Sequence, residues 1–353
     1  MTDETKPQTD NDSRFMRRVL LIAGLAAVLA LLLKLIPVLL LAFAAVIIAV
    51  LVRSLADPIR AVTRLPTGVS IAAATIAILA GLGGAGWLFG STVSAQVEAL
   101  ANRLPGSLTE LKALIETLPF GSQIADQLNG GGGLPDIQGM VGQVGGYVMA
   151  VIGAGANLLL VVFAGLFFAA GPERMRDGLL MLVPRPSRDP LREAANESAR
   201  ALRLWLLGTL ADMVVVGVLT GIGTALIGLP SPVALGLFAG LAAFVPIVGP
   251  IVSVVPGVLL ALEQGPEMIL WTVAVYFIVQ QIESNLFYPF IQKRAVDLPP
   301  VLTLFGVLAL GTLLGPLGVV FASPLLVVAL VWIKLLYLRN TLGEDIQLPG
   351  RTD

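Results

Sequence analysis

The chain has 353 residues, of which 56% are hydrophobic and 13% charged, and its mean hydropathy is +0.90. Soluble globular proteins carry about 25% charged residues, so this composition predicts an all-α integral membrane protein with several spans. The net charge of −1 gives no sign of a nucleic-acid partner, and the absence of cysteine and histidine excludes disulfides, thiolate metal ligands and histidine relays. We expect no cofactor or metal, and proton coupling would have to use aspartate or glutamate.

The first 90 residues predict a short tail followed by three membrane helices. Residues 1–13 are polar and predict a disordered cytoplasmic tail, and residues 14–90 carry the helices. As one helix the apolar run Val19–Val52 would be about 51 Å long, well beyond a hydrocarbon core of about 30 Å. We therefore expect a turn near Lys34–Pro37, giving two helices before a third, Gly68–Gly90. Arginines flank both outer ends of the run, which places those ends in the cytoplasm.

Residues 91–147 form the one sizeable hydrophilic insertion. They carry more acidic than basic side chains, which favours an extracytoplasmic location. Apolar residues recur there every three or four positions, as in amphipathic helices. Two interpretations stay open, a helical cap on the membrane surface or an interface for a homo-oligomer. A fourth membrane helix, residues 148–170, then leads inward to an arginine-rich cytoplasmic loop, residues 171–203, with PRPSRDP as its turn.

Residues 204–338 are predicted to form the functional core. The fifth membrane helix, Leu204–Leu229, runs outward and contains Asp212 close to its inner end. An ionisable side chain at this depth is costly and marks a candidate functional residue. Gly217 and Gly221 make a G-x-x-x-G pattern, which is typical of helices whose backbones pack closely.

Two later segments, Pro232–Leu262 and Leu298–Leu338, are too long to cross once and are interrupted by glycine and proline. The first would be about 46 Å long as an unbroken helix. If each segment enters and leaves on one side, Lys293 and Arg294 fall in the cytoplasm, as the positive-inside rule prefers. This predicts two re-entrant or broken hairpins, one from each face, beside about six full spans. The total is often counted as eight transmembrane helices, with both termini and the tail, residues 339–353, in the cytoplasm.

The glycine- and proline-containing interruptions of these two segments are also candidates for a functional role in transport. Irregular backbone at membrane depth survives only against protein or a water-filled cavity, and paired broken segments point to a transporter binding site. The predicted tips contain Pro246, Gly249 and Pro250 in the first hairpin, and Gly311, Gly315 and Pro316 in the second.

The stretch Trp271–Pro300 places polar side chains in an apolar helix. Gln280, Glu283, Ser284 and Phe287 share one helical face, and Gln281 and Asn285 widen it. The face could be a hydrogen-bonded seam between helices or a site that binds substrate or an ion. In the predicted topology Glu283 and Asp212 lie at similar depth, so they could share a proton or a cation, or each bond a separate partner. The candidate binding residues are Asp212, Gln280, Gln281, Glu283 and Asn285.

Three stretches carry a family resemblance: GLPSPVALGLFAGLAAFVPIVGPIVSVVPGVLLAL, QQIESNLFYPFIQKRAVDLPPVLTLF and GPLGVVFASPLLVV. They resemble the autoinducer-2 exporter-like (AI-2E) permease family, strongly from Leu204 to Leu338 and more weakly back to residue 14. The family's acidic residue falls on Glu283, with its downstream proline on Pro289. Many members have Leu-His-Pro where this chain has Leu298-Pro299-Pro300, so no role of that histidine carries over. The resemblance implies a secondary transporter, because members are described as exporters of a signalling furanone or as sodium- or lithium-linked proton antiporters.

Four functions can be weighed on this basis. The first is a secondary transporter of the bacterial inner membrane that exports a small polar molecule by alternating access. The second is a Na⁺(Li⁺)/H⁺ antiporter that uses Asp212 and Glu283. A membrane enzyme is not expected, because protease signatures and an ATP-binding Walker A sequence are absent. A non-transporting scaffold would leave the broken hairpins and membrane-depth carboxylates unexplained.

Overall fold

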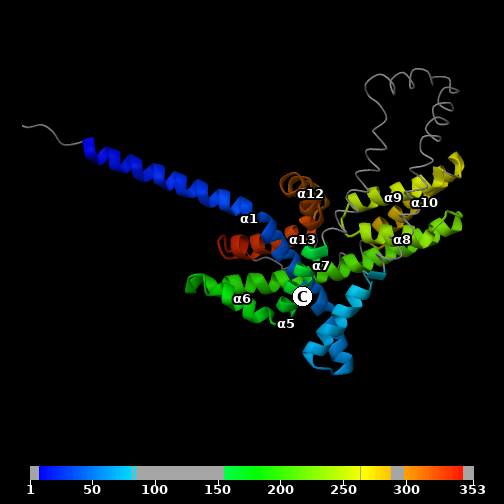
Figure 1. The fold of residues 1–353 in the computed structure, drawn as a ribbon, viewed down its shortest axis with the longest axis horizontal. Coiled ribbons are helices and arrows are strands. Elements are labelled where there is room, and N and C mark those ends of the chain that lie inside the picture. The colour runs from blue at the N-terminus through cyan, green and yellow to red at the C-terminus, as the bar shows by residue number, and fades with distance from the viewer. Residues whose placement is uncertain (1–7, 82, 85–154, 263, 288–297, 345–353) are drawn as a thin grey trace, which may run out of the picture.

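The computed structural model describes residues 8–81, 83–84, 155–262, 264–287 and 298–344. These residues are mostly helical and contain no strand, which confirms the all-helical class (Figure 1). The predicted extracytoplasmic insertion, residues 91–147, lies outside the described residues. The elements are α1 (Gln8–Thr63), a helix at Thr67–Gly81, α5 (Gly155–Ala170), α6 (Pro172–Leu180), α7 (Arg185–Leu226), α8 (Pro232–Ala242), α9 (Val248–Leu262), α10 (Pro266–Ile282), the π-helical η1 (Glu283–Phe287), α12 (Pro300–Leu314), α13 (Pro316–Trp332) and the π-helical η2 (Ile333–Arg339).

Helix lengths support a membrane protein. Within the described residues three helices are long and apolar enough to cross a bilayer, namely Lys34–Thr63 in α1, α7, and Pro316–Arg339, which joins α13 to η2. The helices α8, α9 and α12 are apolar but shorter than a full span.

The N-terminal helix corrects two sequence-based expectations. The predicted turn at Lys34–Pro37 is wrong, since α1 is one helix of 56 residues with Pro37 and Pro58 inside it. A proline removes one backbone hydrogen bond and bends a helix without having to end it. Figure 1 shows the N-terminal part of α1 projecting away from the other helices and changing direction before it reaches them. Residues 8–13, which were expected in a disordered tail, also belong to α1.

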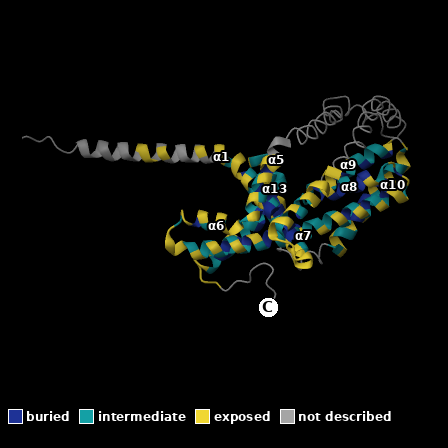
Figure 2. Cartoon of the chain, turned by 60° about the horizontal axis from the view of Figure 1, so that its bottom comes forward, coloured by how far each residue is buried: buried dark blue, intermediate teal, exposed yellow. Residues whose placement is uncertain are grey.

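Helix α7 organises the molecule. It contacts α1, α6, α8, α10 and α13, and at 42 residues it is about 63 Å long. It begins at Arg185, so with α6 most of the predicted cytoplasmic loop is helix. The predicted turn PRPSRDP is wrong, because residues 185–190 form the start of α7 and the chain turns at residues 181–183 instead. Figure 2 shows buried positions gathered where α7 and α13 cross. The core there includes Leu202, Leu206, Val327 and Leu335.

Polar contacts hold the N-terminal half of α7. The Arg203 guanidinium lies 3.0 Å from the Asp57 carboxylate of α1. Arg339 of η2 donates two hydrogen bonds to the Glu193 carboxylate, and Trp332 Nε1 donates to Ser198 Oγ at 3.0 Å. This half of the helix is therefore fixed to both the first and the last described elements.

Glycine contacts hold the C-terminal half of α7 against α8. A Cβ atom placed on Gly236 would lie 2.4 Å from the Gly217 carbonyl oxygen, and one on Gly240 would lie 2.5 Å from the Met213 carbonyl oxygen. Since backbone meets backbone here, no side chain fits between the helices. The predicted close-packing face at Gly217 and Gly221 is confirmed, and α8 supplies a matching glycine pair.

The two interrupted segments form paired helices, α8 with α9 and α12 with α13. In the first pair the helices are joined at residues 243–247, and a Cβ on Gly249 would lie 1.9 Å from the Ala242 carbonyl oxygen. In the second pair Gly315 separates the helices with φ +67°, a conformation that side chains other than glycine rarely adopt. The interruptions fall where the sequence predicted, but α13 with η2 is longer than the half-span expected there.

Candidate functional site

One cavity joins α7, both helix pairs and α10. Its volume is about 480 Å³, within the range of small-molecule sites, roughly 300–1,000 Å³. Helix α7 supplies one wall through Trp205, Gly208, Thr209 and Asp212. The other lining residues are Ala243, Pro246, Ile247, Pro250, Ile251, Gln280, Glu283, Ser284, Leu298, Pro300, Thr303 and Ser323.

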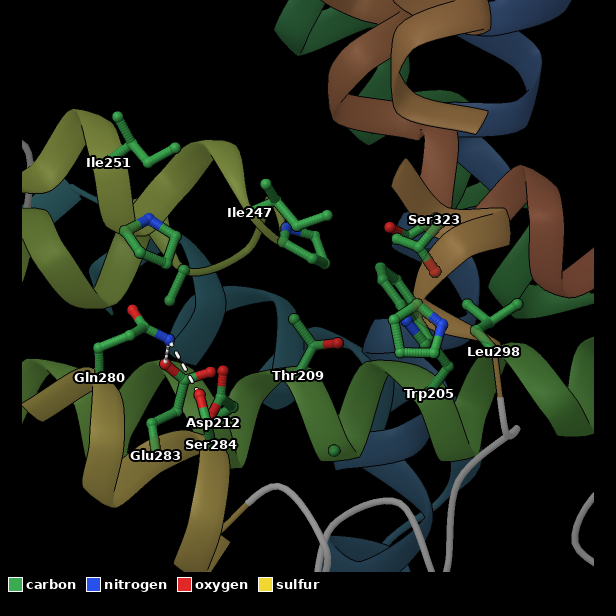
Figure 3. Close-up of a pocket in the computed structure, with 16 residues that line it drawn as sticks. Trp205, Thr209, Asp212, Ile247, Ile251, Gln280, Glu283, Ser284, Leu298 and Ser323 are labelled. Atoms are coloured by element: carbon green, nitrogen blue, oxygen red, sulfur yellow. Dashed lines mark hydrogen bonds between the residues drawn. The ribbon is translucent and has the colours of Figure 1, made fainter. Parts of the chain in front are cut away.

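The polar end of the cavity contains two carboxylates. Figure 3 shows Asp212 and Glu283 facing one another beside Gln280. Gln280 Nε2 donates a hydrogen bond to Glu283 Oε2, and its contact with Ser284 Oγ is 3.4 Å. Asp212 Oδ1 is buried and has no hydrogen-bond partner among the described residues. No lysine or arginine is among the residues that line the cavity, so a proton or a bound cation would have to offset this negative charge.

The helix changes its winding where the site begins. The π-helical turn η1 starts at Glu283, directly after α10, and such turns occur frequently at functional sites. A π-helical turn widens the helix and changes the direction of the side chains that follow. Gln280, Glu283 and Ser284 already share one helical face by their spacing, and all three line the cavity.

The first hairpin contributes a strained residue. Ile247 lines the cavity with φ +70°, a left-handed conformation that is a genuine outlier for a β-branched side chain. Backbone strain of this kind occurs preferentially at ligand clamps and moving parts. Beside it, Phe244 packs edge-on against Trp205, with ring centroids 5.8 Å apart. The hairpin thus positions the aromatic end of the cavity, opposite the carboxylates.

The structure brings some of the predicted site residues together and leaves others apart. Asp212, Gln280, Glu283, Pro246 and Pro250 line the cavity. Gln281 and Asn285 do not; Asn285 Nδ2 donates to the Gln281 carbonyl oxygen at 2.9 Å. Of the other predicted tip residues, Gly249 lies between two lining residues, whereas the Gly311, Gly315 and Pro316 tip is not part of the lining.

The sequence did not predict most of the other residues that line the cavity. One signal was available, because Trp205, Gly208, Thr209 and Asp212 fall at i, i+3, i+4 and i+7 and so share one helical face. The second hairpin reaches the cavity through Pro300 and Thr303 of α12 and Ser323 of α13. No spacing rule connects these residues to α7, because the contact is made only by helix packing.

A family comparison adds to this geometry. A family model described as AI-2E family transporter matches residues 19–338. The chain belongs to the AI-2E transporter family. YrrI of Bacillus subtilis (strain 168) is 30% identical over 164 residues, 46% of each chain. YueF of the same organism is 24% identical over 253 residues, 67% of each chain, and PerM of Escherichia coli (strain K12) is 29% identical over 170 residues, 48% of each chain.

The alignments with YrrI and PerM span about half the length of each protein. The names of these relatives propose a transport or permease role and specify no substrate. The family is described as one of transporters, and the long apolar helices of this chain are compatible with a membrane protein. The family description names neither a transported molecule nor a coupling ion, so both have to be argued from the residues that line the cavity.

Proposed function

We propose that this AI-2E protein is a secondary transporter of the bacterial inner membrane, and that it exports a small polar molecule by alternating access. The observation that carries the proposal is the cavity in which Asp212 and Glu283 meet without a lining lysine or arginine. Two carboxylates at this depth repel one another when both are ionised, so binding a proton or a cation there stabilises the site. The cavity volume is within the range of small-molecule sites, and autoinducer-2 is the small polar molecule that the family resemblance suggests.

In the proposed transport mechanism, each group of lining residues has its own role. Asp212 and Glu283 take up a proton or a cation, and Gln280 orients Glu283 through its hydrogen bond. Thr209, Thr303 and Ser323 offer hydroxyl groups to a polar substrate, while Trp205 offers an aromatic face. The α8–α9 hairpin, which carries the strained Ile247, is the element whose movement would expose the site to the other face.

The same carboxylate pair supports a second candidate, a Na⁺(Li⁺)/H⁺ antiporter. In that reaction the pair itself is the binding site, and a proton and a cation occupy it in turn. The Oδ1 atom of Asp212 has no hydrogen-bond partner in the described part of the chain, which favours this candidate because such an atom is available to an ion.

Glu283→Gln tests the proposal, since glutamine keeps the size and hydrogen bonding of glutamate but cannot titrate. Everted membrane vesicles would be assayed for uptake of autoinducer-2 under a pH gradient, and for collapse of the gradient by added Na⁺ or Li⁺. We expect Glu283→Gln to abolish whichever flux the native protein supports. Glu267→Gln is a matched control, because Glu267 is exposed in the first turn of the same helix.

The possible results separate the candidates. Autoinducer-2 uptake that depends on Glu283 supports export, and cation-induced collapse that depends on Glu283 supports antiport. Normal gradient-driven flux in Glu283→Gln would show that the glutamate only joins helices, and the coupling proposal would fail.

A further inference from the structure

Three buried hydroxyl groups lie outside the cavity and have no hydrogen-bond partner among the described residues. They belong to Thr220 of α7 and to Thr272 and Tyr276 of α10, whose side chains are 0%, 0% and 7% exposed. Leaving a buried polar group unsatisfied costs about 1–3 kcal/mol, so each such group calls for an explanation.

Other buried hydroxyls in the same structure behave differently. They donate to a carbonyl oxygen three or four residues earlier in their own helix, as serine and threonine commonly do in membrane helices. These residues are Ser54, Ser70, Ser198, Thr224, Ser253 and Thr303. Thr220 and Thr272 lack this bond, which leaves their hydroxyls available to a water molecule or a proton carrier between the helices.

The three hydroxyls belong to α7 and α10 and lie on one side of the carboxylates along these helices. The two helices are antiparallel, because Asp212 is close to Glu283 while a Cβ on Gly223 would lie 2.5 Å from Val275. Thr220 is about 12 Å along α7 from Asp212, and Tyr276 is about 10 Å along α10 from Glu283. Both therefore lie on the side where α7 ends and α10 begins.

Helix α9 leaves room for the phenol of Tyr276. A Cβ atom on Gly257 would lie 3.0 Å from the phenolic oxygen and 2.8 Å from Cε2 of the ring. Neither α8 nor α9 contains a charged residue. Asp212, Glu283 and Tyr276 are thus the titratable groups that α7 to α10 turn toward this contact.

An apolar plug separates the carboxylates from the hydroxyls. Val216 of α7 and Val279 of α10 are buried together with Ala239, Ala243 and Tyr276 in one hydrophobic cluster. Each valine lies about one helical turn from a carboxylate on one side and from a hydroxyl on the other. Water would have to displace or pass this plug to connect the two polar regions.

We propose that Thr220, Tyr276 and Thr272 form a proton path of this transporter, closed here by Val216 and Val279. The path connects the Asp212–Glu283 pair with the membrane face at which α7 ends and α10 begins. Each hydroxyl accepts one proton and passes another on, so the chain carries a proton without any net chemical change. The chain has no histidine to serve as a relay, and hydroxyls with bridging water take that role. This inference rests on the proposed coupling role of the carboxylates and names the proton as the ion that reaches them from this side.

A hydroxyl placed in the plug tests the path without any knowledge of the substrate. Val216→Thr is nearly isosteric and adds a group that can bridge the gap. Purified protein would be reconstituted in liposomes that contain pyranine, and a valinomycin-imposed potassium potential would drive protons. We expect proton conductance to rise about tenfold, the change given by lowering a barrier by roughly one hydrogen bond. The rise should vanish in Val216→Thr combined with Tyr276→Phe, and also in combination with Thr272→Val.

Thr224→Val is the matched control in the Val216→Thr background. Thr224 is also fully buried on α7, but its hydroxyl already donates to the Thr220 carbonyl oxygen at 2.7 Å. Adding Thr224→Val to Val216→Thr should therefore leave the raised proton conductance unchanged. A Val216→Thr protein without added conductance, or with conductance that survives Tyr276→Phe, would overturn the path.

Thermal stability in detergent gives a second readout. Because the three hydroxyls have no partner among the described residues, Thr220→Val, Thr272→Val and Tyr276→Phe should unfold at or above the native temperature. A clear loss of stability in all three would show that the hydroxyls have structural partners, and would also overturn the proposal. Failure of the path is distinct from failure of the proposed function, which is decided by gradient-driven flux in Glu283→Gln.

Discussion

Asp212 and Glu283 come from different helices and meet at one cavity, which makes their functional relation testable at the level of single residues. If the two carboxylates form one site, removing either charge removes the whole coupling step. We expect Asp212→Asn to abolish gradient-driven flux as Glu283→Gln does, and the double variant to be no worse than either single one. Double-mutant analysis of flux in proteoliposomes measures this non-additivity. Independent, multiplying losses would mean that the carboxylates serve separate purposes.

At the scale of elements, the glycine contact between α7 and α8 decides how close these helices come. Gly236→Ala would push a methyl group to 2.4 Å from the Gly217 carbonyl oxygen, and backbone cannot move aside as a flexible side chain can. We expect a loss of about 1–3 kcal/mol in unfolding free energy, the usual cost of overpacking. Thermal unfolding in detergent measures it. Gly178→Ala in α6 is the control, because no atom lies within 4 Å of its added Cβ.

The hairpin glycines allow a second prediction at this scale. Gly249→Leu brings its Cβ to 1.9 Å from the Ala242 carbonyl oxygen and must separate α8 from α9. At Gly315 an added Cβ has no atom within 4 Å, but leucine would have to adopt φ +67°, which residues with a side chain rarely do. We expect both variants to insert and to lose transport, which blotting of membranes and vesicle flux would show. The Gly249 variant should lose more, because Gly249 lies between the lining residues Ile247 and Pro250, whereas the tip at Gly315 is not part of the lining. Full transport in both would remove the tips from the mechanism.

For the whole molecule, the charge distribution predicts which face of the membrane each end occupies. The native chain has no cysteine, so an introduced cysteine is unique. Ser187 is exposed in the first turn of α7, within the arginine-rich segment expected in the cytoplasm. In intact cells a membrane-impermeant maleimide should label Gly131→Cys and leave Ser187→Cys unlabelled until the membrane is opened. The opposite labelling would reverse the orientation and, with it, the direction of the proposed proton path.

The sequence by itself determined the helical membrane class, the positions of the hairpin interruptions and the close-packing glycines of α7. These follow from local rules, since hydrophobic length, proline, and glycine spacing act within one segment. It also singled out Asp212 and Glu283, because a carboxylate in an apolar helix is conspicuous without any knowledge of its surroundings. The continuity of α1 through Pro37 was not predictable in this way, because a proline can either bend or end a helix.

Only the tertiary structure decided which side chains surround the carboxylates. Trp205, Thr303 and Ser323 come from helices far apart in the sequence, and their meeting depends on how closely α7 approaches α13 and the hairpins. The same holds for the apolar plug and the unpartnered hydroxyls, since a hydroxyl is recognisable as unsatisfied only when all its neighbours are in place. The spacing of apolar and polar residues within a helix determines which of its faces can be buried. The packing of helices far apart in the sequence determines which atoms each buried polar group contacts.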